Sequence, residues 1–314
     1  MRQTCVNMIF ELAKRDPRVF YIGSDLSPDI TARMARDLPE RAFMEGVSEA
    51  GVVGMGAGLA MEGYIPFVHT IATFITRRCY EQVALDLCLH NLPVRLIGNG
   101  GGLVYAPLGP THLAIEDIAI MRALPNMTVV AVSDAEEMRR FMDQTLDWPG
   151  PIYIRLAKGG DPIISRAENG FQIGKAIPMR SQSGASVALI STGIMTRHAL
   201  TAAEMLAAQG FKTNVLHVHT VKPLDAEAVR RCVDGVQLLA TIEEHTVVGG
   251  LGSAVLDSLI EDMPGPLPAI KRLGIPDTFA KSYGTQDELL EAYGLQPAQI
   301  SATILETLRL MKAA

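Results

Sequence analysis

The chain has 314 residues, 48% of them apolar and 20% charged, which is the composition of a globular protein with room for two domains. A net charge of −6 and the lack of any Lys/Arg-rich run argue against binding to nucleic acid. The apolar stretch at residues 47–61 contains Glu49 and is shorter than the roughly 20 residues that a membrane span needs. We therefore expect a protein that binds neither nucleic acid nor a membrane.

The cysteines match neither a disulfide framework nor a zinc finger, because all four are scattered (Cys5, Cys79, Cys88 and Cys232). The first residues do not show the basic segment, apolar run and cleavage site of a secretory signal. These features predict free thiols and a cytoplasmic location.

The first half of the chain alternates between helix and strand patterns. Apolar residues at helical spacing predict a helix over residues 2–14, and VFYIGSD then predicts a short buried strand. Short apolar strands that alternate with helices are typical of a parallel sheet covered on both faces. The further predicted elements are helices over residues 49–61, 75–90 and 115–122, a helix capped by Asp134, and strands in YIPFVHT, PVRLIG, MTVVAV and PIYIRL.

Residues 161–184 lack long periodicity and are predicted to form a linker. The same alternation then starts again in a second α/β unit. The sequence therefore predicts an α/β protein with two domains, residues 1–160 and 185–314, each a mainly parallel sheet flanked by helices. In the second unit, strands are predicted in ASVALISTG, TNVLHVHT and QLLATIEE, and helices over residues 197–209, 226–233 and 251–259 and from Pro297 onward.

The segment GVSEAGVVGMGAGLAMEG, residues 46–63, places Glu49 at the start of a glycine-rich helix. Each glycine weakens a helix by roughly 1 kcal/mol relative to alanine, so close approach of another backbone or of a flat ligand is expected to offset the loss. A carboxylate in such apolar surroundings is expected to have a raised pKa and to hold or share a proton. The alternative is a capping glutamate on a tightly packed helix.

Two further residues stand where ligand contacts are common. Phe74 lies among small and polar residues at a strand-to-helix junction, where its ring can cover a heterocycle or pack in the core. GNGGG, residues 98–102, lacks the spacing of a nucleotide-binding loop. The turn at residues 109–111 then places His112 just before a helix, as an acid or base near neutral pH or as a cap.

Together and in this order, these segments resemble the transketolase family and its relative deoxyxylulose-phosphate synthase. The resemblance extends over residues 2–305. It implies a thiamine-diphosphate pyrimidine-binding domain followed by a transketolase C-terminal domain. The segments that carry it are GVSEAGVVGMGAGLA, FITRRCYEQV, GPTH and EDIAIMRALPNMTVVAVSDAEE in the first half, and LISTG, VKPLD, TIEEH and GGLGSAV in the second.

The resemblance implies which residues meet thiamine diphosphate. Glu49 falls on the glutamate that hydrogen-bonds the cofactor's aminopyrimidine ring and so promotes formation of its nucleophilic carbon. Phe74 falls on the aromatic residue that stacks on that ring. Asp25 falls on a cofactor-side aspartate, and Ile71 and Arg77 line the same pocket, where the family usually has aromatic residues.

The resemblance also implies substrate contacts. His112 falls on the histidine that contacts a hydroxyl of the ketose donor and helps to move protons, so that it forms the catalytic pair with the carboxyl group described above. Arg2 and Arg155 fall on arginines that can hold an acceptor's phosphate. Leu108 replaces an aspartate that reads a sugar hydroxyl, and Asp29 replaces a phosphate-binding serine. These two departures favour a substrate that is less phosphorylated, less hydroxylated or otherwise modified.

Enzymes of this kind hold Mg²⁺ and the diphosphate on a separate domain that carries a GDG motif. This sequence lacks that motif, because the Gly-Asp pair at residues 160–161 is followed by proline. His217 and His219 share a strand face without a third ligand, so no metal ligand is predicted in this chain. Another subunit is therefore expected to hold Mg²⁺ and the diphosphate. Two such heterodimers are expected to pair as an α₂β₂ tetramer through the glycine-rich helix.

The sequence thus predicts the C-terminal subunit of a two-component transketolase. With its partner, it is expected to transfer a two-carbon ketol unit from a ketose to an aldehyde. One alternative is decarboxylative carboligation or oxidation of a 2-oxoacid, as in deoxyxylulose-phosphate synthase or the β subunit of 2-oxoacid dehydrogenases. Another is a scaffold that has lost activity, against which the presence of Glu49, Phe74 and His112 argues. The donor, the acceptor and the pathway stay open.

Overall fold

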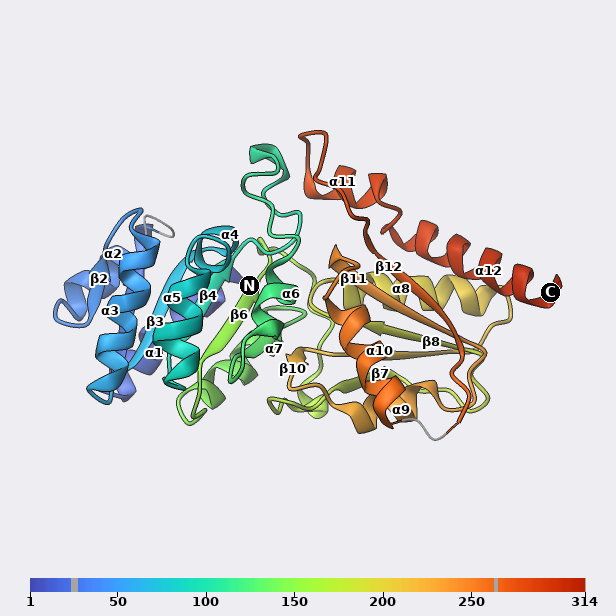
Figure 1. Ribbon diagram of the computed structural model, residues 1–314, viewed down its shortest axis with the longest axis horizontal. Coiled ribbons are helices and arrows are strands. Elements are labelled where there is room, and N and C mark those ends of the chain that lie inside the picture. The colour runs from blue at the N-terminus through green and yellow to red at the C-terminus, as the bar shows by residue number, and fades with distance from the viewer. Residues whose placement is uncertain (24–27, 263–264, 314) are drawn as a thin grey trace.

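The computed structural model describes residues 1–23, 28–262 and 265–313, which form two α/β units joined end to end (Figure 1). The first unit holds a seven-stranded sheet in the order β10-β5-β6-β4-β3-β1-β2. Neighbouring strands are parallel except for the antiparallel pair β10 and β5. The strands are β1 (Val19–Gly23), β2 (Ala42–Met44), β3 (Ile65–Ile71), β4 (Arg95–Asn99), β5 (Thr128–Ala131), β6 (Ile152–Leu156) and β10 (Thr220–Lys222).

The second unit holds a five-stranded sheet in the order β12-β11-β8-β9-β7. Only the β7–β9 pair is antiparallel among these described strands. Its strands are β7 (Ile177–Arg180), β8 (Val187–Ser191), β9 (Thr213–His217), β11 (Leu238–Thr246) and β12 (Ala269–Ile275).

Helices cover both faces of each sheet, and the central strands are therefore buried on both sides. In β1, Val19 and Tyr21 pack with α1 (Arg2–Arg15) and α7 (Ala135–Met142) on one face, while Ile22 packs with α3 (Glu49–Met61) on the other. None of the helices in the described part of the chain is both long and apolar enough to cross a bilayer. The first unit has α1 (Arg2–Arg15), α2 (Pro28–Asp37), α3 (Glu49–Met61), α4 (Ala72–Thr76), α5 (Tyr80–Gln82), α6 (Asp117–Ala123) and α7 (Ala135–Met142), and the second has α8 (Met195–Ala208), α9 (Ala226–Val233), α10 (Leu251–Asp262), α11 (Gln286–Ala292) and α12 (Pro297–Ala313).

The fold confirms the predicted class, two α/β units with mainly parallel sheets, and corrects it in detail. The helix expected over residues 75–90 is broken into α4, α5 and a π-helical turn at Val83–Leu89. The linker expected at residues 161–184 contains the edge strand β7. The strand β10 lies beyond residue 185 in the chain, yet it pairs with β5 and completes the first sheet. The two units are therefore joined by a strand as well as by a connecting segment.

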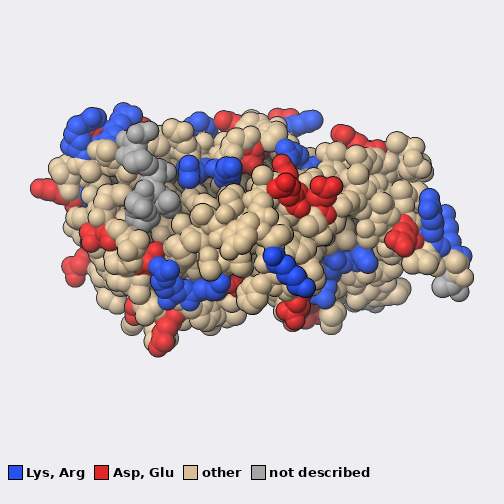
Figure 2. Space-filling model, turned by 90° about the horizontal axis from the view of Figure 1, so that it is seen from above, with Lys and Arg blue, Asp and Glu red and all other residues tan. Residues whose placement is uncertain are grey.

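The carboxyl ends of the parallel strands of the first sheet meet at one edge, where ligands commonly bind in such folds. At this edge β3 runs into α4, β4 runs into the glycine-rich loop, and Gly101 of that loop donates to the Leu156 carbonyl at the end of β6. Figure 2 views the molecule from above. On this face Lys and Arg side chains form small separate groups among larger uncharged areas.

Candidate active site

Glu49 is the first residue of α3, and its side chain is only 2% exposed. A carboxylate at this place is favoured by the positive end of the helix dipole. The sequence had led us to expect this carboxylate to be alone in apolar surroundings, but it has a charged partner. Arg78 donates from Nη1 to Glu49 Oε2 at 2.6 Å, and the Arg78 side chain stays half-exposed.

Phe74 lies in α4, partly buried, and faces the same guanidinium. The Arg78 Cζ atom lies 4.2 Å from the centre of the Phe74 ring, which is the geometry of a cation–π contact. The His112 ring meets Phe74 edge-on with 5.2 Å between ring centres. The structure thus brings Glu49, Phe74 and His112 together, with Arg78 between the first two.

His112 belongs to a loop at residues 103–113 that stands above the first sheet. Its Nδ1 atom lies 2.9 Å from the Thr111 hydroxyl. Arg77 secures the end of this loop, donating from Nη2 to the Leu113 carbonyl at 2.8 Å and pairing with Glu116 at 2.5 Å. Arg77, predicted to line the cofactor pocket, therefore contacts the histidine loop, and Arg78, which the sequence did not single out, contacts Glu49 and Phe74. Ile71, another predicted pocket residue, ends β3 and is the N-cap of α4.

A small cavity of about 160 Å³ lies beside this group of residues. Arg2 and Leu108, two predicted substrate residues, line it together with Lys158. Asn99 and Tyr105 form another part of its wall, and Asn99 Nδ2 donates to the Tyr105 hydroxyl at 2.7 Å. Burial raises the pKa of Tyr105, so its hydroxyl stays protonated and can donate a hydrogen bond.

One feature places this cavity close to His112, and another suits it to a polar ligand. The Tyr105 ring lies 6.4 Å from that of His112, centre to centre. The Asn99 Oδ1 atom is buried and has no hydrogen-bond partner among the described residues. A buried polar atom without a partner is costly, so a polar ligand or a water is expected to satisfy it. Lys158 was missed from the sequence because a lone lysine after a strand carries no motif.

Arg155 lies elsewhere than predicted. Its side chain is 7% exposed, and Nε donates to Asp117 Oδ2 at 2.7 Å. Its Nη2 donates to the carbonyls of Ala114 and Glu244. These bonds commit Arg155 to the contact between the two sheets. The cavity that Arg155 lines there has a volume of only about 10 Å³, too small for a phosphate. A phosphate-binding role for this residue stays a prediction that the arrangement does not favour.

Two predicted residues have no side chain among those that the structure describes. Asp25 lies outside the described residues. Asp29 belongs to α2, but its side chain lies outside what the structure describes. No group of three or more His, Cys, Asp or Glu side chains that could hold a metal ion is found within the described ranges. His217 pairs with Glu137 at 2.9 Å, and His219 stacks on the Phe171 ring.

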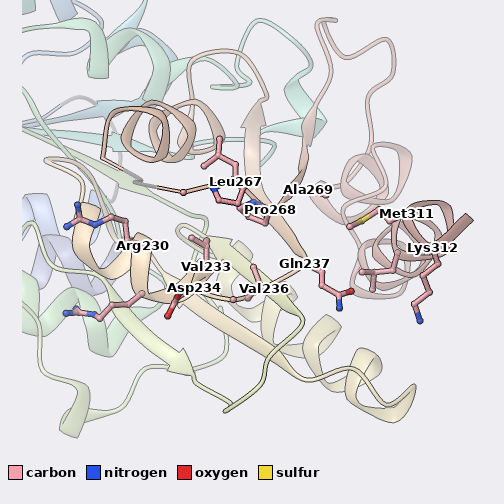
Figure 3. A pocket seen from close by; sticks show the side chains of 15 residues that line it. Arg230, Val233, Asp234, Val236, Gln237, Leu267, Pro268, Ala269, Met311 and Lys312 are labelled. Atoms are coloured by element: carbon pink, nitrogen blue, oxygen red, sulfur yellow. The ribbon is translucent and has the colours of Figure 1, made fainter. Parts of the chain in front are cut away.

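A larger cavity of about 870 Å³ lies on the second unit, between α9, α12 and the starts of β11 and β12 (Figure 3). Its wall is mostly apolar, with Arg230 and Lys312 at the rim. None of the predicted site residues lines it. Size alone therefore does not identify the active site of this chain, and the polar and aromatic groups around Glu49 are the stronger candidate.

Comparison with known proteins identifies the family of this chain. The family model "Transketolase, pyrimidine binding domain" matches residues 1–160, and "Transketolase, C-terminal domain" matches residues 174–300. The chain is 39% identical over 301 residues to the 6-deoxy-6-sulfo-D-fructose transketolase subunit SqwH of Clostridium sp. (strain MSTE9), covering 96% of this chain and 92% of that protein. It is 33% identical over 307 residues to an apulose-4-phosphate transketolase subunit of Phocaeicola vulgatus, covering 97% and 96%.

Two further comparisons concern the extent of the match. A solved "Split gene transketolase, inactive beta4 tetramer" superposes with a TM-score of 0.88 at 34% identity, covering 98% of each chain. The 1-deoxy-D-xylulose-5-phosphate synthase of Symbiobacterium thermophilum is 38% identical over 299 residues, which is 94% of this chain but 45% of that protein. The chain thus spans nearly the full length of split subunits and about half of the single-chain synthase.

Proposed function

The chain belongs to the transketolase family, and we propose that it is the C-terminal subunit of a thiamine-diphosphate-dependent transketolase that transfers a two-carbon ketol unit from a ketose to an aldehyde. The observation that carries this proposal is the stack of Glu49, a planar cation and Phe74. It supplies the two contacts that an aminopyrimidine ring needs, a buried carboxyl group at its edge and an aromatic face.

The position of the Arg78 side chain supports the fit of an aminopyrimidine ring between Glu49 and Phe74. The Arg78 guanidinium is flat, presents an N–H group to Glu49 at 2.6 Å and lies over Phe74 at 4.2 Å. An aminopyrimidine protonated on its ring nitrogen is also flat and also presents an N–H group at its edge. A space that holds the first group therefore suits the second in shape and in polarity.

The chain's own residues then have distinct tasks. Glu49 holds a proton at the ring nitrogen, and its burial keeps competing water away. Phe74 supports the ring face. When bound, the cofactor would supply a nucleophilic carbon for attack on a ketose carbonyl. His112, 5.2 Å from Phe74 between ring centres, moves a proton at a donor hydroxyl.

The small cavity beside Tyr105 is the proposed acceptor site. Arg2 and Lys158 place two cationic side chains on its wall, and Leu108 supplies an apolar part. Two cations and a protonated phenol suit an anionic group at the far end of a sugar. The two split-transketolase relatives carry the names of a sulfonated and a phosphorylated sugar. We propose that the acceptor or donor of this chain likewise bears an anionic group.

We further propose a partner subunit that carries the diphosphate and Mg²⁺, and an α₂β₂ assembly in the cytoplasm. The exposed face of α3 supports an external contact. A Cβ atom added at Gly51, Gly54 or Gly58 would meet nothing within 4 Å, so packing inside this chain does not require glycine there. A partner backbone that approaches α3 closely would explain them. The cysteines at positions 5, 79, 88 and 232 are free thiols, which suits a reducing compartment. We also propose that the first domain ends at residue 160 and that the second begins at residue 185.

The test is to co-purify the partner subunit and to assay the pair with ketose and 2-oxoacid donors. Ketol transfer predicts turnover of a ketose with an aldehyde acceptor, no need for a lipoyl acceptor and no release of CO₂. Release of one CO₂ per turnover, with 2-oxoacids as the preferred donors, would instead establish the decarboxylative alternative.

A further inference from the structure

Arg78 occupies a position that the proposed reaction requires to be free. Its guanidinium is bonded to the Glu49 carboxylate and covers the Phe74 ring at the same time. Phe74 lies in α4, and Arg78 follows four residues later in the turn just past the Arg77 C-cap, so both side chains come from one short stretch of chain. The contact is therefore built into the local sequence and needs no partner chain to form.

We infer that Arg78 is a placeholder for the aminopyrimidine ring, which fills the ring's place in the free subunit and must leave when the cofactor binds. The inference rests on the proposed function, and it adds that Arg78 competes with the ring for Glu49 and Phe74. Glu49 Oε2 cannot accept from Nη1 of Arg78 at 2.6 Å and bond a ring nitrogen in the same place. Phe74 likewise cannot offer to the ring the face that the Arg78 guanidinium already covers at 4.2 Å.

The surroundings allow Arg78 to move. Its side chain is 49% exposed, so that a change of rotamer takes the guanidinium into solvent, whereas Glu49 at 2% exposure stays fixed. Arg77 next to it is bonded to Glu116 and to the Leu113 carbonyl, so the neighbouring cation does not replace it at Glu49. While Arg78 is in place, only the fraction of molecules with the arginine displaced can bind the ring, and the apparent affinity falls by that fraction.

This arrangement has a consequence for the lone subunit. A buried carboxylate with an open aromatic face would be an unpaired charge in a hydrophobic setting, which is unfavourable. Arg78 compensates that charge until the cofactor arrives with the diphosphate-binding partner. The same arginine would keep the isolated chain from binding free pyrimidines.

The experiment uses the isolated full chain and the neutral aminopyrimidine alcohol fragment of thiamine, titrated by calorimetry or by ligand-detected NMR. Arg78→Met keeps a long side chain but can neither pair with Glu49 nor form a cation–π contact. It should bind the fragment about five- to thirtyfold more tightly than wild type. Arg139→Met is the matched control, because Arg139 is 52% exposed and paired with Glu136 at 3.1 Å away from the site. It should bind as wild type does.

The outcomes separate this inference from the proposed function. If Arg78→Met binds the fragment more tightly and adding Phe74→Ala removes that increase in affinity, both the placeholder and the ring site are supported. Binding that depends on Phe74 but is equal or weaker in Arg78→Met would overturn the placeholder and leave the ring site intact. Binding that ignores Phe74, or none by any variant at millimolar concentration, would remove the ring site itself and the placeholder with it. A double-mutant cycle of Glu49→Gln and Arg78→Met on urea unfolding checks the bridge without any ligand, and zero coupling there would also overturn it.

Discussion

The side-chain carboxylate of Glu244 accepts a hydrogen bond from the backbone N–H of Leu103 at 3.0 Å, so that a residue of the second sheet holds the loop that carries His112. Gly102 lies beside it at φ +71°, where an added Cβ would fall 2.5 Å from Glu244 Oε2. Gly102 also exchanges two backbone hydrogen bonds with Ala114, which close the base of the loop. The second domain therefore helps to position a residue of the proposed active site from outside the first domain.

Glu244→Ala should loosen this loop. The substitution leaves the buried Leu103 N–H without its acceptor, so the free energy of unfolding should fall by about 1–3 kcal/mol. Amide hydrogen exchange in residues 103–113 should become faster than in wild type. Glu244→Gln is the control, because its amide oxygen can still accept from Leu103. Unchanged exchange in the alanine variant would show that the loop is held by other contacts.

The pH dependence of stability should also report on Glu244. Burial raises its pKa to about 7, above the ordinary value of 4.5. Between these pH values the folded protein binds more protons than the unfolded one, so this carboxyl's contribution to the free energy of unfolding is fully present below about 4.5 and is lost as the pH rises to about 7.

The difference between wild type and Glu244→Gln isolates this contribution. Burial lowers the pKa of His245 to about 4, which gives the opposite dependence, but both proteins retain that histidine and it cancels. We expect wild type to lose stability relative to the variant as the pH rises through this window, measured by urea unfolding. Two parallel curves would contradict the raised pKa of Glu244.

The exposed glycines of α3 should separate folding from assembly. Gly58→Ala should stabilise the isolated chain by about 1 kcal/mol, because alanine favours a helix and its Cβ meets no atom there. Association with the partner or with a second copy should weaken, as measured by analytical ultracentrifugation. Gly56→Ala is the contrast, since its Cβ would press on Val68 Cγ2 at 3.1 Å inside the chain. A Gly58→Ala chain that is more stable and assembles as wild type does would place the contact elsewhere.

Lys158→Met should discriminate between substrates. In the reconstituted enzyme the KM for an anionic acceptor should rise about tenfold or more, since a hydrogen bond to a charged group contributes about 1.5–3 kcal/mol. The KM for an uncharged aldehyde and kcat should change little. Lys175→Met, at an exposed lysine in the stretch between the sheets, is the control. An equal loss for charged and uncharged acceptors would argue against an anion site at Lys158.

Much of the fold could be predicted from the sequence, because apolar periodicity reports local structure directly. The helix at Glu49 and the buried strands follow from it. The prediction of one continuous helix over residues 75–90 was wrong in part, since a π-helical turn leaves the apolar pattern almost unchanged. Strand β10 was missed because three residues at a sheet edge carry too little signal.

The site was only partly predictable for a different reason. Glu49, Phe74 and His112 were found through motifs, and they lie together in the structure. Arg78 escaped notice because its two contacts depend on side-chain geometry. Glu244 escaped notice because it is 141 residues away from Leu103 in the chain. Contacts between distant segments cannot be inferred from local spacing.

The most direct test of the account is the turnover of the reconstituted pair with Glu49→Gln. The amide keeps the size of the side chain but cannot hold or return the proton at the ring nitrogen. We predict that kcat falls at least about 100-fold, a typical contribution of proton transfer, while the variant still unfolds cooperatively and binds its partner as wild type does. Full activity in this variant would contradict the role of Glu49 and with it the central claim.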